Sequence, residues 1–178
     1  MPVVSRQRAN PRAVEAPVTT AAIDSAQFRQ VLGHYPTGVA VITATGADGE
    51  PLALVVGTFT SVSLDPPLVG FLPTRQSYSW QQIEATGHFA ANIFGADQVA
   101  ECAKLAGRDD KFDGVEWSLS SGGLPLLTNA IATIECSIHA VQDAGDHVFV
   151  LGLVEALAVR REAEPMVFWR GRYGGFAG

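Results

Sequence analysis

Short runs of apolar and β-branched residues, separated by residues that favour turns, recur along most of the chain. Runs of this length with Gly, Pro, Asn or Asp at their ends are typical of β-strands. The Asp48-Gly49 pair and the segment 143–146 predict hairpin turns. The pattern predicts strands over residues 38–46, 51–56, 58–63, 68–72, 88–94, 130–141, 147–159 and 165–169.

Apolar residues at helical spacing predict three short helices. The first begins after an N-cap at Asp24 and ends before Pro36. The second covers residues 77–85, and the third runs from residue 95 to residue 105. Residues 107–123 are polar and irregular, so they predict a loop. The apolar face of the first helix comprises Phe28, Val31, Leu32 and Tyr35.

The order of these elements predicts a mainly β (α+β) fold. Hairpin-type turns join most of the strands, and regular helical crossovers between strands are lacking. Such a pattern favours an antiparallel barrel or sandwich with a few short helices outside it, and not a doubly wound parallel sheet.

The length of 178 residues is typical of one domain. Residues 1–22 are rich in Pro, Ala and Arg without an apolar period, so they predict a flexible N-terminal arm before a folded domain at 23–178. The N-terminus lacks the apolar core of a secretion signal, and no run of about 20 apolar residues suggests a membrane span. We therefore expect a cytoplasmic protein.

The charge of the chain and the motifs that it lacks argue against several classes of function. The net charge of −6 argues against a nucleic-acid-binding protein. The four histidines share no metal-ligand spacing, and His88 and His139 fit partly buried strand residues, so no metal site is predicted. Cys102 and Cys136 lie far apart and are expected to be reduced and half-buried, with a single disulfide between them as the less favoured alternative. Motifs for a nucleophile elbow, a Walker A loop and a zinc protease are absent.

Three segments place polar residues where strands and turns meet. Residues 57–63 alternate hydroxyl and apolar side chains after a glycine, which suits a ligand cradle but also a solvated strand face. Residues 75–80 combine Arg75 with two serines at a helix start, which suits either an anion site or a plain N-cap pair. The third, Gly145-Asp146-His147, is by itself an ordinary hairpin tip.

Together these segments resemble the flavin reductase-like family, which folds as an FMN-binding split barrel and includes the reductase components of two-component flavin monooxygenases. The resemblance spans roughly residues 25–175. The stretches that carry it are 35–39, 58–68, 77–80, 89–92, 110–112 and 145–147, followed by Gly152.

The resemblance implies an NAD(P)H:flavin oxidoreductase that takes FMN or FAD as the flavin and NADH or NADPH as the hydride donor. It also implies a homodimer and a separate flavin-dependent monooxygenase as partner. His147 would line the nicotinamide side. Relatives often carry Asn-Ser where this chain has Gly57-Thr58. The implied flavin-binding residues are Thr37, Gly57, Thr58, Ser61, Val62, Ser63, Ser77, Ser79 and Lys111.

Two other functions fit the same residues. One is a flavoprotein that retains FMN and acts on its own small substrate. The other is a flavin- or haem-binding carrier without nicotinamide chemistry. The hairpin tip with His147 favours the reductase, because a carrier has no need of it. The small number of basic residues, 12 Lys and Arg in all, favours NADH over NADPH, whose 2′-phosphate is usually bound by an arginine.

Overall fold

The computed structural model describes residues 23–176, so the predicted arm at 1–22 lies outside the described residues. The helices are α1 (Ser25–Leu32), α2 (Tyr78–Thr86), η2 (Ala96–Gln98) and α3 (Val99–Leu105). The strands are β1 (Thr37–Gly38), β2 (Ala40–Thr45), β3 (Pro51–Val56), β4 (Thr60–Leu64), β5 (Pro67–Phe71), β6 (His88–Ile93), β7 (Trp117–Leu119), β8 (Pro125–Leu127), β9 (Ala132–Ala144), β10 (His147–Val159), β11 (Met166–Trp169) and β12 (Arg172–Gly175).

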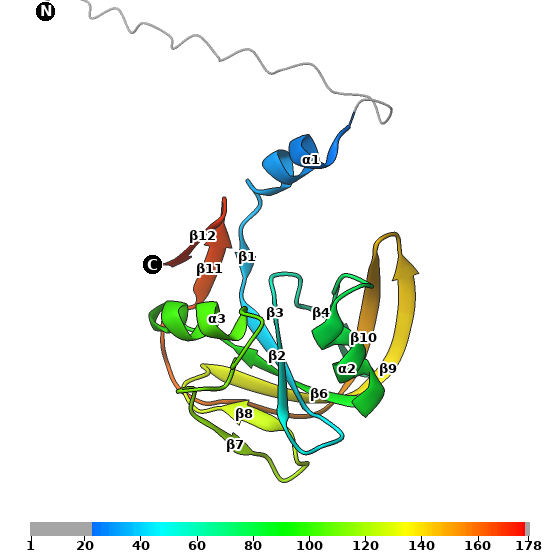
Figure 1. Ribbon diagram of the computed structural model, residues 1–178, viewed down its shortest axis with the longest axis vertical. Coiled ribbons are helices and arrows are strands. Elements are labelled where there is room, and N and C mark those ends of the chain that lie inside the picture. The colour runs from blue at the N-terminus through cyan, green and yellow to red at the C-terminus, as the bar shows by residue number, and fades with distance from the viewer. Residues whose placement is uncertain (1–22, 177–178) are drawn as a thin grey trace, which may run out of the picture.

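Seven antiparallel strands form one curled sheet in the order β3-β2-β6-β9-β10-β5-β4. The long hairpin β9–β10 bends around the body, while β3 and β4 end the sheet without pairing with each other (Figure 1). A three-stranded sheet, β1-β11-β12, and the pair β7–β8 complete the fold. The predicted antiparallel barrel with short peripheral helices is confirmed, and its open seam makes it a split barrel.

Strand β2 is buried on both faces because it separates two hydrophobic clusters. Ala40, Ile42 and Ala44 point into the cluster inside the curled sheet, where α2 contributes Trp80 and Ile83. The alternate side chain of Val41 points to the second cluster, which lies beneath α3. Side chains alternate across a strand, so a strand with both faces covered reads as a continuous apolar run. This explains why the segment from Val39 to Ala44 is so apolar.

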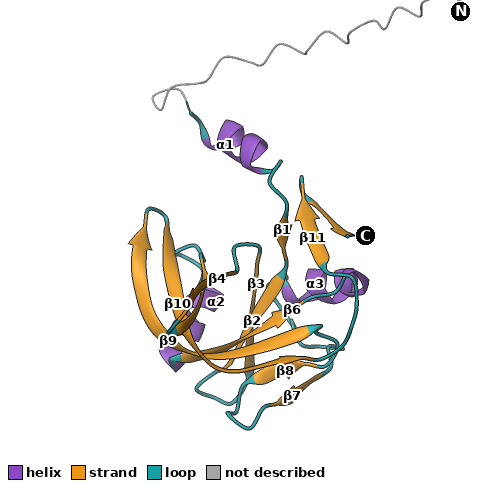
Figure 2. Cartoon of the chain, turned by 180° about the vertical axis from the view of Figure 1, so that it is seen from behind, coloured by secondary structure: helices purple, strands orange, loops and turns teal. Residues whose placement is uncertain are grey.

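Helix α1 forms as predicted, but residues 23–176 do not bury its apolar face. Asp24 caps it by accepting hydrogen bonds from the backbone N–H groups of Ala26 and Gln27. Figure 2 shows α1 standing away from the barrel, attached through β1. The four apolar residues of its predicted face are all exposed, among them Val31 at 62% and Tyr35 at 72%. Helical periodicity therefore identified the helix correctly, but the described residues leave its apolar face exposed.

Several local expectations were wrong. The loop predicted over 107–123 contains β7, and β12 was not predicted, because β7 has only three residues and β12 is rich in glycine. Strand β4 begins at Thr60 and carries a register shift between Ser61 and Ser63, so the regular alternation expected over 58–63 is broken.

The expected cysteine and histidine environments also differ in detail. Both cysteines are free, as predicted, but they are fully buried. Burial raises the pKa of the Cys136 thiol to about 12, which makes it inert. His88 and His139 lie on strands with exposed, not partly buried, side chains. Over residues 23–176, no group of three or more His, Cys, Asp or Glu residues is arranged to hold a metal ion.

Candidate functional site

The three polar segments found in the sequence meet at the end of β5. The backbone N–H of Leu72 donates to the Thr58 hydroxyl oxygen at 2.9 Å. Two residues later, Thr74 forms an antiparallel bridge with His147 at the start of β10. The chain then passes directly into α2, which Ser77 caps by accepting from the Trp80 backbone N–H at 3.3 Å. The sheet topology therefore brings together residues that are about 90 positions apart in sequence.

His147 lies at the tip of the β9–β10 hairpin, next to a two-residue turn in which Gly145 has a φ of 71°. Its Nδ1 is 2.7 Å from Oδ1 of Asp146, and its side chain is 38% exposed. The hydrogen bond to His147 lowers the pKa of Asp146. The hydrogen bond at Nδ1 thus fixes the orientation of the imidazole ring, and the ring is accessible at the surface, so it is suited to contacting a ligand.

A hollow of about 700 Å³ lies between α1, β1 and the turn from β11 to β12, and Thr37, Gly57 and Thr58 line it. The Thr37 hydroxyl is buried there and has no hydrogen-bond partner among the described residues. A Cβ at position 57 would stand 2.8 Å from that hydroxyl oxygen, so any side chain larger than glycine would displace it. The buried Thr37 hydroxyl lacks a hydrogen-bond partner in the described part of the chain, and the space beside it stays open only because residue 57 is glycine. Both features fit a ligand with a polar edge, such as the isoalloxazine ring of a flavin.

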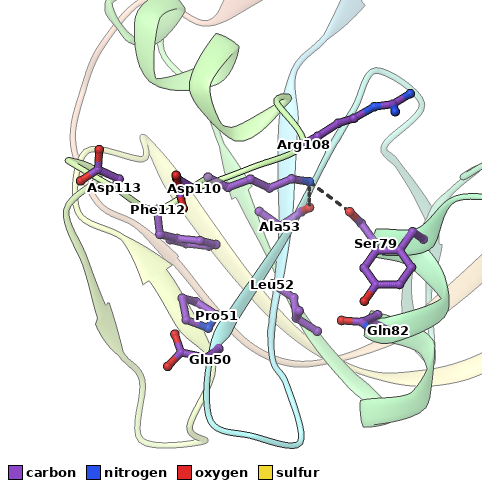
Figure 3. Close-up of a pocket in the computed structure, with 12 residues that line it drawn as sticks. Glu50, Pro51, Leu52, Ala53, Ser79, Gln82, Arg108, Asp110, Phe112 and Asp113 are labelled. Carbon is purple, nitrogen blue, oxygen red and sulfur yellow. Dashed lines mark hydrogen bonds between the residues drawn. The ribbon is translucent and has the colours of Figure 1, made fainter.

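A second hollow, of about 390 Å³, opens between β3, α2 and the loop at 108–113 (Figure 3). Nζ of Lys111 donates to the Ala53 carbonyl oxygen at 2.8 Å and to the Ser79 hydroxyl at 3.0 Å. Burial lowers the pKa of Lys111, since desolvation penalises the charged ammonium group. Arg108 extends from the same loop and lines the hollow. Sequence reasoning missed Arg108, although its place three residues before Lys111 is a signal that could have found it.

The predicted flavin-binding residues therefore fall into separate groups. Thr37, Gly57 and Thr58 share one hollow, while Ser79 and Lys111 line the other. Ser61, Val62 and Ser63 line neither of the two, and they lie on β4 at the edge of the sheet, with Val62 exposed. Ser77 serves as a helix cap. Strand β3 connects the two hollows. Its residues Pro51 to Ala53 line the hollow that contains Lys111, and Gly57, which lines the hollow that contains Thr37, directly follows the last residue of the strand.

A split antiparallel barrel with hollows at the two ends of β3 defines a protein of the split-barrel class with room for an extended ligand. The model of the flavin reductase-like domain matches residues 32–177, and the chain belongs to this family. The chain is 48% identical over 165 residues to a flavin reductase of Pseudomonas putida, covering 92% of this chain and 97% of that protein.

Two further relatives extend the comparison. The chain is 45% identical to the reductase subunit HsaB of a flavin-dependent monooxygenase from Rhodococcus jostii, over 89% of this chain and 81% of that protein. The crystal structure of the NADH:FAD oxidoreductase SgcE6 from Streptomyces globisporus, in complex with NAD and FAD fragments, matches with a TM-score of 0.83 and 36% identity. That match covers 91% of this chain and 98% of SgcE6. The predicted family and its split-barrel fold are confirmed.

Proposed function

We propose that the protein is an NAD(P)H:flavin oxidoreductase that reduces FMN or FAD and supplies the reduced flavin to a separate flavin-dependent monooxygenase. The observation that carries this proposal is the pairing of two hollows along β3. Gly57 and the unpartnered Thr37 hydroxyl stand at one end, and Ala53 beside Lys111 at the other. Four residues of strand span about 13 Å. This arrangement suits an extended ligand with a ring at one end and a phosphate at the other.

The bound flavin supplies the hydride-accepting chemistry, with the nicotinamide as donor. The protein's own residues bind and orient the pair. Thr37 provides a hydrogen bond to the polar edge of the ring, and Gly57 lets the ring approach the backbone. Thr58 is held by the Leu72 backbone at 2.9 Å, which fixes the strand segment that borders the ring. The edge strand β4 offers the hydroxyl and backbone groups of Ser61, Val62 and Ser63. Precise orientation of this kind supplies much of the rate enhancement when no acid or base is needed.

Arg108 and Lys111 bind the phosphate in this proposal, together with the hydroxyl of Ser79. Lys111 already donates two hydrogen bonds within the chain, so Arg108 supplies the additional cation. Replacing Arg108 by serine is expected to raise the Kd for FMN about tenfold, or about 1.4 kcal/mol, because a charge-assisted hydrogen bond is lost. Fluorescence quenching of FMN and of riboflavin measures this. Equal weakening of riboflavin, which has no phosphate, would contradict the assignment, and Arg172→Ser on β12 serves as the matched control.

His147 contacts the nicotinamide side in this proposal, since it is accessible and oriented by Asp146. His147→Ala is expected to lower kcat/KM for NADH about tenfold, because an incorrectly placed nicotinamide loses near-attack geometry. The Kd for the flavin is expected to stay the same. Steady-state kinetics with NADH varied at saturating flavin measures the effect, with His88→Ala as the control. Unchanged KM and turnover in His147→Ala would remove this role.

The protein acts as a homodimer in this proposal, with the domain at 23–178 as the repeating unit. The support is the exposed apolar face of α1, which borders the hollow containing Thr37 and Gly57. A second chain over this face would bury it and close the flavin hollow. Val31→Glu is expected to give monomers with weakened flavin binding, as sedimentation and fluorescence titration would show. Leu119→Glu adds the same charge at an exposed apolar position on β7 that lines neither hollow, and it is expected to leave the dimer intact.

The reaction is placed in the cytoplasm in this proposal, where NADH is available and cysteines stay reduced. The two free cysteines agree with that compartment. Within residues 23–176, no helix combines the length and apolarity that crossing a bilayer requires.

The function is tested by following the nicotinamide absorbance with NADH and NADPH in turn, each with added FMN, FAD or riboflavin. Rapid oxidation that depends on added flavin is the expected result, and it identifies the preferred pair. A purified protein that keeps a yellow flavin and oxidises neither nucleotide would overturn the reductase and favour a carrier. Tightly retained FMN with turnover of another small substrate would favour a flavoprotein with its own reaction.

A further inference from the structure

Arg75 connects the tip of the β9–β10 hairpin to the start of α2. Its guanidinium group donates to Oδ1 of Asp143 at 2.8 Å and to the carbonyl oxygen of Gly145 at 3.3 Å. Its backbone N–H donates to the carbonyl oxygen of Asp146 at 3.0 Å. Its own carbonyl oxygen accepts from Nε2 of Gln81, on α2, at 3.2 Å. One residue therefore contacts both the hairpin tip that carries His147 and helix α2.

The side chain of Arg75 is already engaged, which argues against its serving as a phosphate ligand. One terminal nitrogen is paired with a carboxylate and the other with a backbone carbonyl. It lines neither the hollow that contains Lys111 nor the one that contains Thr37. From sequence alone, a cation near a helix start suggests anion binding. The contacts with Asp143 and Gly145 show instead that the Arg75 side chain is bound to the hairpin tip.

The hairpin tip has few other restraints. Asp143 and Asp146 are largely exposed, and the turn between β9 and β10 projects from the sheet (Figure 1). The remaining contacts to the segment after β5 are the bridge between Thr74 and His147 and a hydrogen bond from the Val148 backbone N–H to the carbonyl oxygen of Pro73. An ion pair as exposed as that of Arg75 and Asp143 contributes little to stability. The same ion pair matters more for the reaction rate than for stability when it fixes the position of a group in the site, because a misplacement of about 1 Å can lower the rate about 100-fold.

We propose that Arg75 is a positioning residue that fixes the β9–β10 hairpin tip, and with it His147, against the start of α2. The inference rests on the proposed function, in which His147 meets the nicotinamide. It makes a distinct claim, namely that the orientation of His147 depends on a side chain that touches neither flavin nor nicotinamide.

Kinetics provide the first test. Arg75→Ala and Asp143→Ala are each expected to raise the KM for NADH and lower kcat/KM about tenfold, with the FMN Kd and the Tm unchanged. The double variant is expected to be no worse than Arg75→Ala, because the contact that Asp143→Ala removes is already lost in Arg75→Ala. Arg75→Lys should restore part of the loss. Lys104→Ala breaks an ion pair of similar exposure, between Lys104 and Asp113, and is the matched control. A raised FMN Kd in Arg75→Ala but not in Asp143→Ala would overturn the proposal in favour of ligand binding.

Nuclear magnetic resonance of the ligand-free protein provides a readout that is independent of activity. The ring protons of His147 are expected to shift and broaden in Arg75→Ala, while those of His34, His88 and His139 stay in place. Unchanged His147 signals would overturn the inference. Two results together separate the claims. If the His147 signals shift in Arg75→Ala but NADH kinetics stay normal in His147→Ala, Arg75 positions His147 while His147 itself has no role in nicotinamide binding. The two claims therefore fail separately.

Discussion

Alanine at position 152 is expected to lower the free energy of unfolding by about 2–3 kcal/mol, because it overpacks the centre of the barrel. Gly152 lies on β10, where an added Cβ would clash with Cζ of Phe89 and stand 3.1 Å from Cβ of Cys136. The ring of Phe89 is fully buried and packs edge-on against Phe71 at a centroid distance of 5.3 Å. The ring has no free space to move into, so β10 must shift or the ring must leave its rotamer.

Urea denaturation of the Gly152→Ala variant measures this loss. Gly174→Ala on β12 is the control, because a Cβ there meets no atom within 4 Å, and its effect should stay within about 0.5 kcal/mol. Phe89→Leu in the Gly152→Ala background should recover part of the stability by removing the ring edge. A Gly152→Ala variant as stable as the original chain would mean that the β9–β10 hairpin is much less tightly packed than described.

Replacing Thr37 with valine is expected to raise the stability of the ligand-free protein and to weaken its binding of flavin. A buried hydroxyl without a partner costs about 1–3 kcal/mol, so replacing it with a methyl group should stabilise the ligand-free protein by about 1 kcal/mol. The same change removes the hydrogen bond proposed for the flavin and should raise its Kd about tenfold. A residue with a purely structural hydroxyl would instead lose stability and leave flavin binding unchanged.

Thermal denaturation without flavin and fluorescence titration with flavin measure the two effects. Thr37→Ser retains the hydroxyl and is expected to keep the flavin affinity. Gly57→Ala is expected to weaken binding because its Cβ would displace the Thr37 hydroxyl. In the Thr37→Ala background, Gly57→Ala should add little, since the displaced atom is already gone. Equal effects of Gly57→Ala in both backgrounds would argue against this coupling.

The sequence was sufficient to predict the elements whose patterns are strong and local. The Asp48-Gly49 turn, the paired runs around it and the long hairpin all form. The apolar period of α1 and its Asp24 cap were correctly identified. The broken register in β4 was not, because a bulge depends on the partner strand and has no clear mark in its own residues. β7 pairs with β8 over only three residues, which is too short for a periodic pattern.

For the site, the sequence indicated the residue types but not their partners. Thr58, Lys111 and His147 were chosen through a family resemblance, and their individual roles stay predictions. The unpartnered state of the Thr37 hydroxyl and the engagement of Arg75 are tertiary properties. Each depends on chain segments more than ten residues away, so no window of sequence contains it. Arg75 in particular was a candidate from its charge alone, and its contacts point to a different task.

The burial of β2 on both faces has a thermodynamic consequence for the whole domain. Because the strand belongs to two hydrophobic clusters at once, neither cluster can lose its packing without exposing the back of the other. The two cores are therefore expected to melt in one cooperative transition. A ligand that binds only the folded state raises the melting temperature of that single transition, whichever hollow it occupies. Thermal shift thus reports binding anywhere on the barrel, while locating the ligand needs the residue-specific changes described above.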